Sequence, residues 1–270
     1  MLCLCALAGC AAAELLEGKR ARAVRLATEA GWRTLELEAG RFTLTAFHKG
    51  FEGRPAELVV YIESDGDAWR NRFQLAADPT PANPLALRLA LADPAPSVLY
   101  LGRPCQYTRP ATAQNCHPAY WAGQRYAEAV INSIDVAIDQ VKRVAAARAV
   151  VLVGYSGGGA VAALVAARRD DVARLITVAA NLDHAAWTAH HRLAPLSGSL
   201  NPADHAERLQ SLPQVHFAGA KDRVVPPHIV EAYLERMGEG AGARLVVVEG
   251  ADHDCCWVEA WPDLLRRHRP

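Results

Sequence analysis

Apolar and polar residues along this chain form two alternating patterns, short apolar runs and longer amphipathic stretches. Continuous apolar runs are typical of strands buried on both faces, and they occur at residues 58–62, 97–101, 149–153, 175–179, 215–218 and 244–248. Between them, apolar residues at helical spacing predict helices at residues 122–147, 160–168, 227–237 and 257–268. Strands that alternate with helices predict an α/β fold with a mostly parallel sheet covered by helices on both faces.

The first hundred residues depart from this alternation. Residues 34–38 and 42–47 alternate apolar and polar side chains with a period of two, and Ala39-Gly40 lies between them. This pattern predicts an antiparallel hairpin at one edge of the sheet. Residues 14–30 fit a helix or a polar lead-in, and the proline-rich segment 78–96 fits a surface connection with one short helix.

The chain is expected to form a single domain from residue 10 to residue 270. It has 270 residues, 51% of them hydrophobic, with no internal repeat and no low-complexity linker. Residues 181–212 are polar and irregular, and are a candidate lid over a site. Trp187, Leu193 and Leu196 in this segment either line an apolar site or pack the lid itself, and the second interpretation is the simpler.

Charge gives no reason to expect nucleic acid as a partner. Lys and Arg number 29, as do Asp and Glu, so the formal net charge is zero. Beyond the N-terminal segment no run of 18 apolar residues occurs. The cysteines lack the paired spacing of a zinc site, so no metal is expected.

The N-terminal segment resembles a processing signal. Residues 1–13 are almost wholly apolar, and Leu7-Ala8-Gly9-Cys10 is similar to a bacterial lipobox, which implies removal of residues 1–9 and a diacylglycerol on Cys10. The stretch is short and lacks basic residues, so a misassigned start codon or a buried apolar N-terminus are alternatives. We expect a lipid-anchored protein of the bacterial cell envelope that faces the periplasm, and Ala11 favours the outer membrane.

Four of the seven cysteines follow Cys10. Cys105 and Cys116 bracket a short loop and are the most natural disulfide, which would stabilise the fold by roughly 2–3 kcal/mol. Cys255 and Cys256 are adjacent, and either a vicinal disulfide or two free buried thiols fits them. An even number of cysteines is consistent with an oxidising compartment.

Residues 154–158 carry the strongest chemical signal in the chain. Their sequence, Gly-Tyr-Ser-Gly-Gly, is a Gly-x-Ser-x-Gly pattern centred on Ser156, between the expected strand 149–153 and the helix 160–168. This context predicts a sharp turn that exposes a serine nucleophile, with glycines where a Cβ would clash with the backbone. The alternative is an unreactive glycine-rich turn in a degenerate, non-catalytic hydrolase.

A serine hydroxyl needs a base to become nucleophilic. His253 follows the last expected strand and is the natural general base. Asp222 follows the strand 215–218 and is the natural acid that orients it. Asp183 is an alternative acid, whereas Asp252 and Asp254 flank the histidine too closely to orient it.

The oxyanion formed during acyl transfer needs two backbone N–H groups. Gly157, directly after the nucleophile, is expected to supply one, and Asp65, in the turn after the strand 58–62, the other. Glu63 and Asp65 would bring negative charge near the site and disfavour anionic acyl groups.

The chain resembles the α/β-hydrolase superfamily from about residue 34 onward. Within it, the likeness is to bacterial lipoprotein-type serine hydrolases, which carry similar stretches to residues 61–66 (Tyr-Ile-Glu-Ser-Asp-Gly), 103–107 (Arg-Pro-Cys-Gln-Tyr), 153–159 and 253–257 (His-Asp-Cys-Cys-Trp). Ser64 stands where such relatives tend to have glycine. The resemblance implies a hydrolase without metal or cofactor, and names no substrate.

Together these features predict a hydrolase that cleaves an ester or thioester of a small-molecule or lipid-like acyl substrate through an acyl-enzyme on Ser156. Amidase, peptidase or acyltransferase chemistry on the same three residues is an alternative, as is a non-catalytic binding protein of the envelope. The sequence does not determine acyl chain length or oligomeric state.

Overall fold

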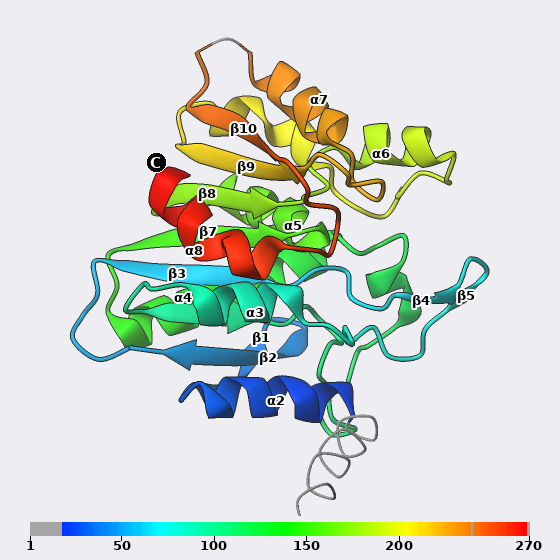
Figure 1. The fold of residues 1–270 in the computed structure, drawn as a ribbon. Helices are drawn as coiled ribbons and strands as arrows, with labels where there is room; N and C mark the ends of the chain where they lie inside the picture. Colours follow the sequence, from blue (N-terminus) through cyan, green and yellow to red (C-terminus); the bar gives the residue numbers. More distant parts are fainter. Residues whose placement is uncertain (1–17, 239, 269–270) are drawn as a thin grey trace, which may run out of the picture.

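A computed structural model of the chain describes residues 18–238 and 240–268 (Figure 1). Its centre is an eight-stranded sheet in the order β1-β2-β6-β3-β7-β8-β9-β10. Across the sheet, these strands are β1 (Arg33–Ala39), β2 (Phe42–Lys49), β6 (Val98–Leu101), β3 (Glu57–Ile62), β7 (Ala149–Tyr155), β8 (Val172–Val178), β9 (Gln214–Gly219) and β10 (Ala243–Val248).

Strands β6, β3, β7, β8, β9 and β10 run parallel to one another. At the edge beside β6, β2 runs antiparallel to both of its neighbours, β6 and β1. Gly40 closes the β1–β2 hairpin with a φ of +61°, a left-handed conformation that glycine adopts without steric cost. The mostly parallel sheet and its N-terminal hairpin confirm the predicted fold class.

Helices cover both faces of the sheet. One face packs against α4 (Glu128–Ala145), α5 (Gly157–Ala166) and α7 (Pro227–Met237). The other packs against α2 (Lys19–Glu29), α3 (Leu85–Ala92) and α8 (Trp257–His268), and α3 and α8 lie in front of the sheet in Figure 1. The central strands are therefore buried on both sides, which explains why their sequences read as continuous apolar runs.

Two helices begin elsewhere than the pattern predicted. The helix expected from residue 122 begins at Glu128, because a 3₁₀ turn η1 (Pro118–Trp121) and further turns precede it. In these turns the Tyr126 N–H donates to Ser199 Oγ at 3.0 Å, which ties them to the 181–212 segment. The helix expected from residue 160 begins at Gly157, directly after the serine.

The structure also contains a small hairpin that the sequence pattern did not predict. Strands β4 (Trp69–Asn71) and β5 (Gln74–Leu75) pair with each other and not with the main sheet. Figure 1 shows this hairpin projecting from the body of the fold, on the same side as α6 (His184–His191). It was missed because its strands are short and largely exposed, so they lack an apolar alternation.

The segment 181–212 contains α6 and two 3₁₀ turns, η2 (Pro202–His205) and η3 (Glu207–Leu209). The expected leader segment 1–9 and Cys10 lie outside the described residues. Within residues 18–238 and 240–268, every helix is too short or too polar to cross a bilayer.

Two disulfides are present among the described residues. One joins Cys105 to Cys116 and closes the loop that follows β6. The other joins the adjacent Cys255 and Cys256, just before α8. The sequence left open whether Cys255 and Cys256 form a disulfide or are two free buried thiols. In the structure both residues are exposed and joined by a disulfide.

Candidate active site

Ser156 lies at the carboxyl end of β7, in the centre of the sheet. Its φ of +52° and ψ of −122° are rare for a residue with a side chain. Its N–H donates to the carbonyl of Val178 at 2.9 Å, which holds the turn against β8. The strained turn exposes the side chain at the edge of the sheet while α5 begins at the next residue.

The flanking glycines are required by close backbone approach. A Cβ at Gly154 would lie 2.3 Å from the carbonyl oxygen of Gly158. A Cβ at Gly158 would lie 2.2 Å from the carbonyl oxygen of Ile62. Both distances are far below van der Waals contact, so the Gly-x-Ser-x-Gly pattern is a packing requirement of this turn.

Ser156, His253 and Asp222 form one hydrogen-bonded chain. His253 Nε2 lies 3.0 Å from Ser156 Oγ, and its Nδ1 lies 2.8 Å from Asp222 Oδ2. Asp222 Oδ1 accepts the N–H groups of Val224 and Val225, both at 2.8 Å. The aspartate is thus fixed from both sides, and it can hold a proton on Nδ1 while Nε2 accepts the serine proton.

The loop that carries His253 is held in place by hydrogen bonds from two aromatic side chains. The Nε1–H of Trp257 donates to the His253 carbonyl at 3.1 Å. The hydroxyl of Tyr155, directly before the serine, donates to Asp254 Oδ1 at 2.9 Å. Burial, followed by the nearby Asp254 carboxylate, raises the pKa of Tyr155 well above its usual value, so this hydroxyl keeps its proton. The ring of Tyr155 lies 5.5 Å from the imidazole and limits its position.

The alternative acids have other roles in the structure. Asp183 Oδ1 caps the N-terminus of α6 by accepting the N–H groups of Ala185 and Ala186. Asp252 accepts the N–H groups of Cys255 and Asp254. These two hydrogen bonds are the main reason why the pKa of Asp252 is lowered. Among the four candidate acids, Asp183, Asp222, Asp252 and Asp254, it is Asp222 that is hydrogen-bonded to the imidazole.

The two residues predicted to supply the oxyanion donors, Asp65 and Gly157, are in close contact. A Cβ at Gly157 would lie 2.2 Å from Asp65 Oδ1, so the turn after β3 packs directly against the start of α5. Within the described residues, the N–H groups of Asp65 and Gly157 have no hydrogen-bond acceptor, whereas those of Ser64, Gly66 and Asp67 each donate. Asp65 and Gly157 therefore each keep an N–H group without an acceptor among the described residues, and both residues line the same cavity as Ser156.

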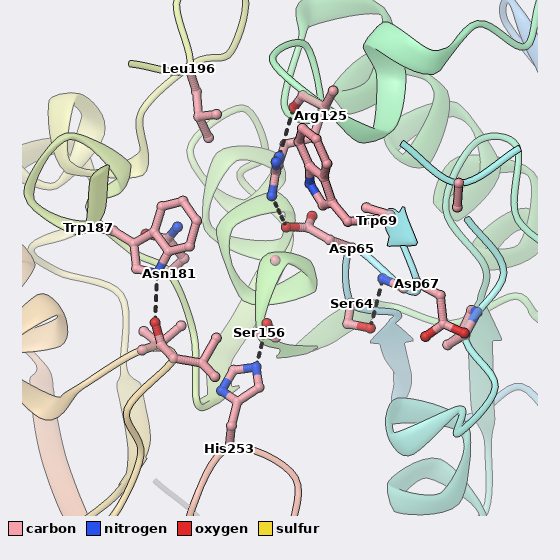
Figure 2. Close-up of a pocket in the computed structure, with 18 of the residues that line it drawn as sticks. Ser64, Asp65, Asp67, Trp69, Arg125, Ser156, Asn181, Trp187, Leu196 and His253 are labelled. Carbon is pink, nitrogen blue, oxygen red and sulfur yellow. Dashed lines mark hydrogen bonds and ion pairs between the residues drawn. The ribbon is translucent and has the colours of Figure 1, made fainter. Parts of the chain in front are cut away.

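The carboxylate of Asp65 is neutralised by two arginines. Arg125 Nη1 lies 2.7 Å from Oδ2, and Arg103 Nη1 lies 2.9 Å from Oδ1 (Figure 2 shows the Arg125 pair). Burial alone would raise the pKa of Asp65, but the two guanidinium groups outweigh it and hold this pKa below its usual value. The expectation that Asp65 gives the site negative charge is therefore wrong, because one carboxylate faces two cations.

Glu63 does not line the cavity. It is fully buried, and its carboxyl accepts the Ser64 N–H at 2.7 Å and the Tyr100 hydroxyl at 2.9 Å. Burial raises the pKa of Glu63, and those hydrogen bonds offset only part of the effect. The Ser64 hydroxyl accepts the Gly66 N–H at 3.2 Å, so a serine at this position supports the turn.

A cavity of about 1300 Å³ opens over Ser156 and His253. Figure 2 shows Trp187 and Trp69 on opposite sides of this space. Trp187, Leu193 and Leu196 all line it, as one of the two interpretations of the sequence expected, and Leu196 also packs into the hydrophobic core. Trp187 is positioned by its Nε1–H, which donates to the Val224 carbonyl at 2.7 Å.

Comparison with known proteins places this geometry in a family. A family model for serine hydrolases (FSH1) matches residues 89–252, more than half of the chain. The chain belongs to the FSH1 serine hydrolase family. No curated protein matches it. The family match confirms that the protein is a serine hydrolase.

Solved structures support the same fold. An esterase from Pyrococcus furiosus has a TM-score of 0.61 at 13% identity, covering 90% of this chain and 93% of that one. An alpha-beta serine hydrolase homologue from Coxiella burnetii has a TM-score of 0.59 at 17% identity, covering 87% and 94%. A serine hydrolase without lid from Xanthomonas campestris has a TM-score of 0.56 at 15% identity, covering 87% and 94%. These similarities confirm the α/β-hydrolase fold.

Sequence reasoning missed the two arginines that pair with Asp65 in the turn after β3. Arg103 belongs to the Arg-Pro-Cys-Gln-Tyr stretch that contributes to the resemblance, which was a usable signal. Arg125 fell within an expected helix and looked like an ordinary surface charge, although its side chain is only 9% exposed. No local pattern distinguishes it, because its partner Asp65 lies 60 residues away.

Proposed function

We propose that this serine hydrolase cleaves carboxylic esters, thioesters included, through an acyl-enzyme on Ser156. The observation that carries the proposal is the continuous hydrogen-bonded chain from Asp222 through His253 to Ser156. A second observation agrees with it: the free N–H groups of Asp65 and Gly157 lie beside the nucleophile, where negative charge develops on a carbonyl oxygen.

In the proposed reaction, Ser156 Oγ attacks the acyl carbonyl while His253 Nε2 takes the hydroxyl proton. Asp222 keeps the imidazole oriented and stabilises the imidazolium. His253 then gives the proton to the leaving alcohol or thiol as the carbonyl–oxygen or carbonyl–sulfur bond breaks. Water, deprotonated by the same imidazole, releases the acid and restores Ser156.

The cavity favours an uncharged acyl group of moderate size. Its walls include Trp187, Leu193 and Leu196, which suit an apolar chain, and the Asp65 carboxylate in the same wall is paired with Arg125 and Arg103. The Pyrococcus furiosus structure of similar fold is an esterase, which agrees with an ester as substrate.

We also propose that Cys10 carries a diacylglycerol and anchors the enzyme in the bacterial envelope. The proposal rests on Leu7-Ala8-Gly9-Cys10 and on the four later cysteines, which the structure joins in two disulfides suited to an oxidising compartment. Mass analysis of the N-terminus of protein isolated from bacterial membranes tests it. An unmodified Met1 or Cys10 would contradict it.

A fluorophosphonate probe and a series of p-nitrophenyl esters test the proposed reaction. We expect the probe to label the protein on Ser156, and Ser156→Ala to lose both labelling and turnover. Labelling with turnover of amides and none of esters would replace the ester proposal by the amidase alternative. A folded protein that is not labelled and turns over no acyl substrate would support the alternative of a non-catalytic binding protein.

A further inference from the structure

Exposed large apolar side chains gather around the mouth of the active-site cavity. In the described part of the chain six such residues are exposed, and four of them lie there: Trp69 (48%), Phe73 (81%), Leu193 (52%) and Val224 (46%). Trp69, Leu193 and Val224 line the cavity itself, and Phe73 lies on the same hairpin as Trp69. We call these four residues the apolar rim. Its position is unlike a random scatter of surface residues.

The β4–β5 hairpin adds positive charge to this rim. Arg70 and Arg72 are exposed on it, and neither has an acidic partner among the described residues. The Arg72 guanidinium lies 4.6 Å from the centre of the Phe73 ring. By contrast, the neighbouring Asp67 is paired with Lys19 at 2.9 Å. The hairpin therefore presents two aromatic rings and two unpaired cations together.

This combination matches the surface of an anionic bilayer. Tryptophan and phenylalanine partition into the boundary between headgroups and acyl chains, and each nearby arginine attracts anionic headgroups. We propose that the apolar rim, with Arg70 and Arg72, is a docking surface for an anionic lipid bilayer, and that docking places the mouth of the cavity against the membrane. This inference concerns binding and does not depend on the chemistry proposed for Ser156.

The start of the described chain lies on the same side. Lys19, the first residue of α2, lines the cavity. The chain from Cys10 to Gly18 spans at most about 29 Å when fully extended. A lipid on Cys10 would therefore tether the protein close to the face that carries the rim, so the anchor and the docking surface would act on one membrane.

Binding to lipid vesicles tests the proposal with the full chain carrying Cys10→Ser, which cannot be lipidated. We expect tighter binding to vesicles of phosphatidylcholine with phosphatidylglycerol than to phosphatidylcholine alone. Phe73→Ser should weaken binding about tenfold, and Arg70→Glu at least about fivefold on the anionic vesicles. Val144→Ser and Arg148→Glu, exposed residues next to the start of β7 at the opposite end of the sheet, are the matched controls and should bind as the parent does.

A second readout locates the contact. Brominated lipid should quench tryptophan fluorescence, and Trp69→Phe should remove most of this quenching, whereas Trp32→Phe, a buried control, should not. Phe73→Ser should hydrolyse a soluble ester normally, because Phe73 does not line the cavity. Equal binding to both vesicle types, or equal losses in the control variants, would overturn the proposal. So would a dimer in sedimentation that Phe73→Ser dissociates, since the rim would then join two copies of the chain.

Discussion

The carboxylate of Asp65 lies against the α-carbon of Gly157, so that a Cβ at position 157 would come within 2.2 Å of Asp65 Oδ1. Asp65 cannot move aside easily, because Arg103 and Arg125 hold both of its oxygens. The contact joins the turn after β3 to the start of α5. It therefore fixes the spacing between the two N–H groups that we assign to the oxyanion.

Gly157→Ala is expected to reduce kcat about a hundredfold, the loss typical of removing one oxyanion donor. The added methyl group must push the Asp65 turn away from Ser156, which separates the two donors. Steady-state kinetics on a soluble ester measures the effect. Gly18→Ala, where a Cβ meets nothing within 4 Å, is the control and should keep full activity. Normal turnover by Gly157→Ala would show that the oxyanion is bound elsewhere.

Asp65→Asn is expected to lower the free energy of unfolding by about 3 kcal/mol, because it leaves two buried guanidinium groups without their carboxylate. The side chains of Arg103 and Arg125 are 4% and 9% exposed. Asp67→Asn is the matched control two residues away. Its partner Lys19 is 34% exposed, so the loss there should be below about 1 kcal/mol. Denaturant unfolding compares the two, and equal losses would contradict the argument from burial.

Asp222→Asn is expected to reduce kcat about 10,000-fold, because an amide cannot hold the imidazole in the tautomer that accepts the serine proton. Asp183→Asn should leave turnover unchanged, since asparagine caps a helix about as well as aspartate. Turnover of an activated ester, with circular dichroism as a check on folding, separates the two candidates. If Asp183→Asn is the inactive variant, the assignment of the acid is wrong.

Glu63 should make stability depend on pH. Its pKa is raised in the folded state, so the folded protein binds this proton more tightly than the unfolded chain does. The resulting stabilisation is complete below the unfolded pKa of about 4.3 and is lost as pH rises through the folded value. Relative to Glu63→Gln, the parent should therefore lose stability as pH rises from that point.

Urea unfolding of the parent and Glu63→Gln at a series of pH values measures this difference, in which all other titrating groups cancel. Glu36→Gln is the control, because Glu36 is partly exposed and pairs with Arg20 and Arg109 at the surface. A difference between parent and Glu63→Gln that stays constant with pH would show that the buried carboxyl keeps the same charge in both states.

Much of the fold was predictable because the central strands are buried on both faces. Such strands must be apolar throughout, so runs such as residues 149–153 stand out from the helices around them. The start of the long helix was predicted six residues too early, because local sequence does not show the tertiary contacts made there. Residues 122–127 have helical composition, but contacts such as that of Tyr126 with Ser199 hold them in turns.

The sequence by itself determined which serine, histidine and aspartate come together at the site. A Gly-x-Ser-x-Gly turn between an apolar strand and a small-residue helix, followed by Asp222 and His253 after later strands, is local information, because each residue sits at the end of its own element. Tertiary structure alone decided the charge around that chemistry. Asp65 and Glu63 look like two anions in sequence, yet Arg103 and Arg125 neutralise one and burial raises the pKa of the other. The charge at a site depends on distances and solvent exposure, which arise only when segments 38 to 60 residues apart pack together.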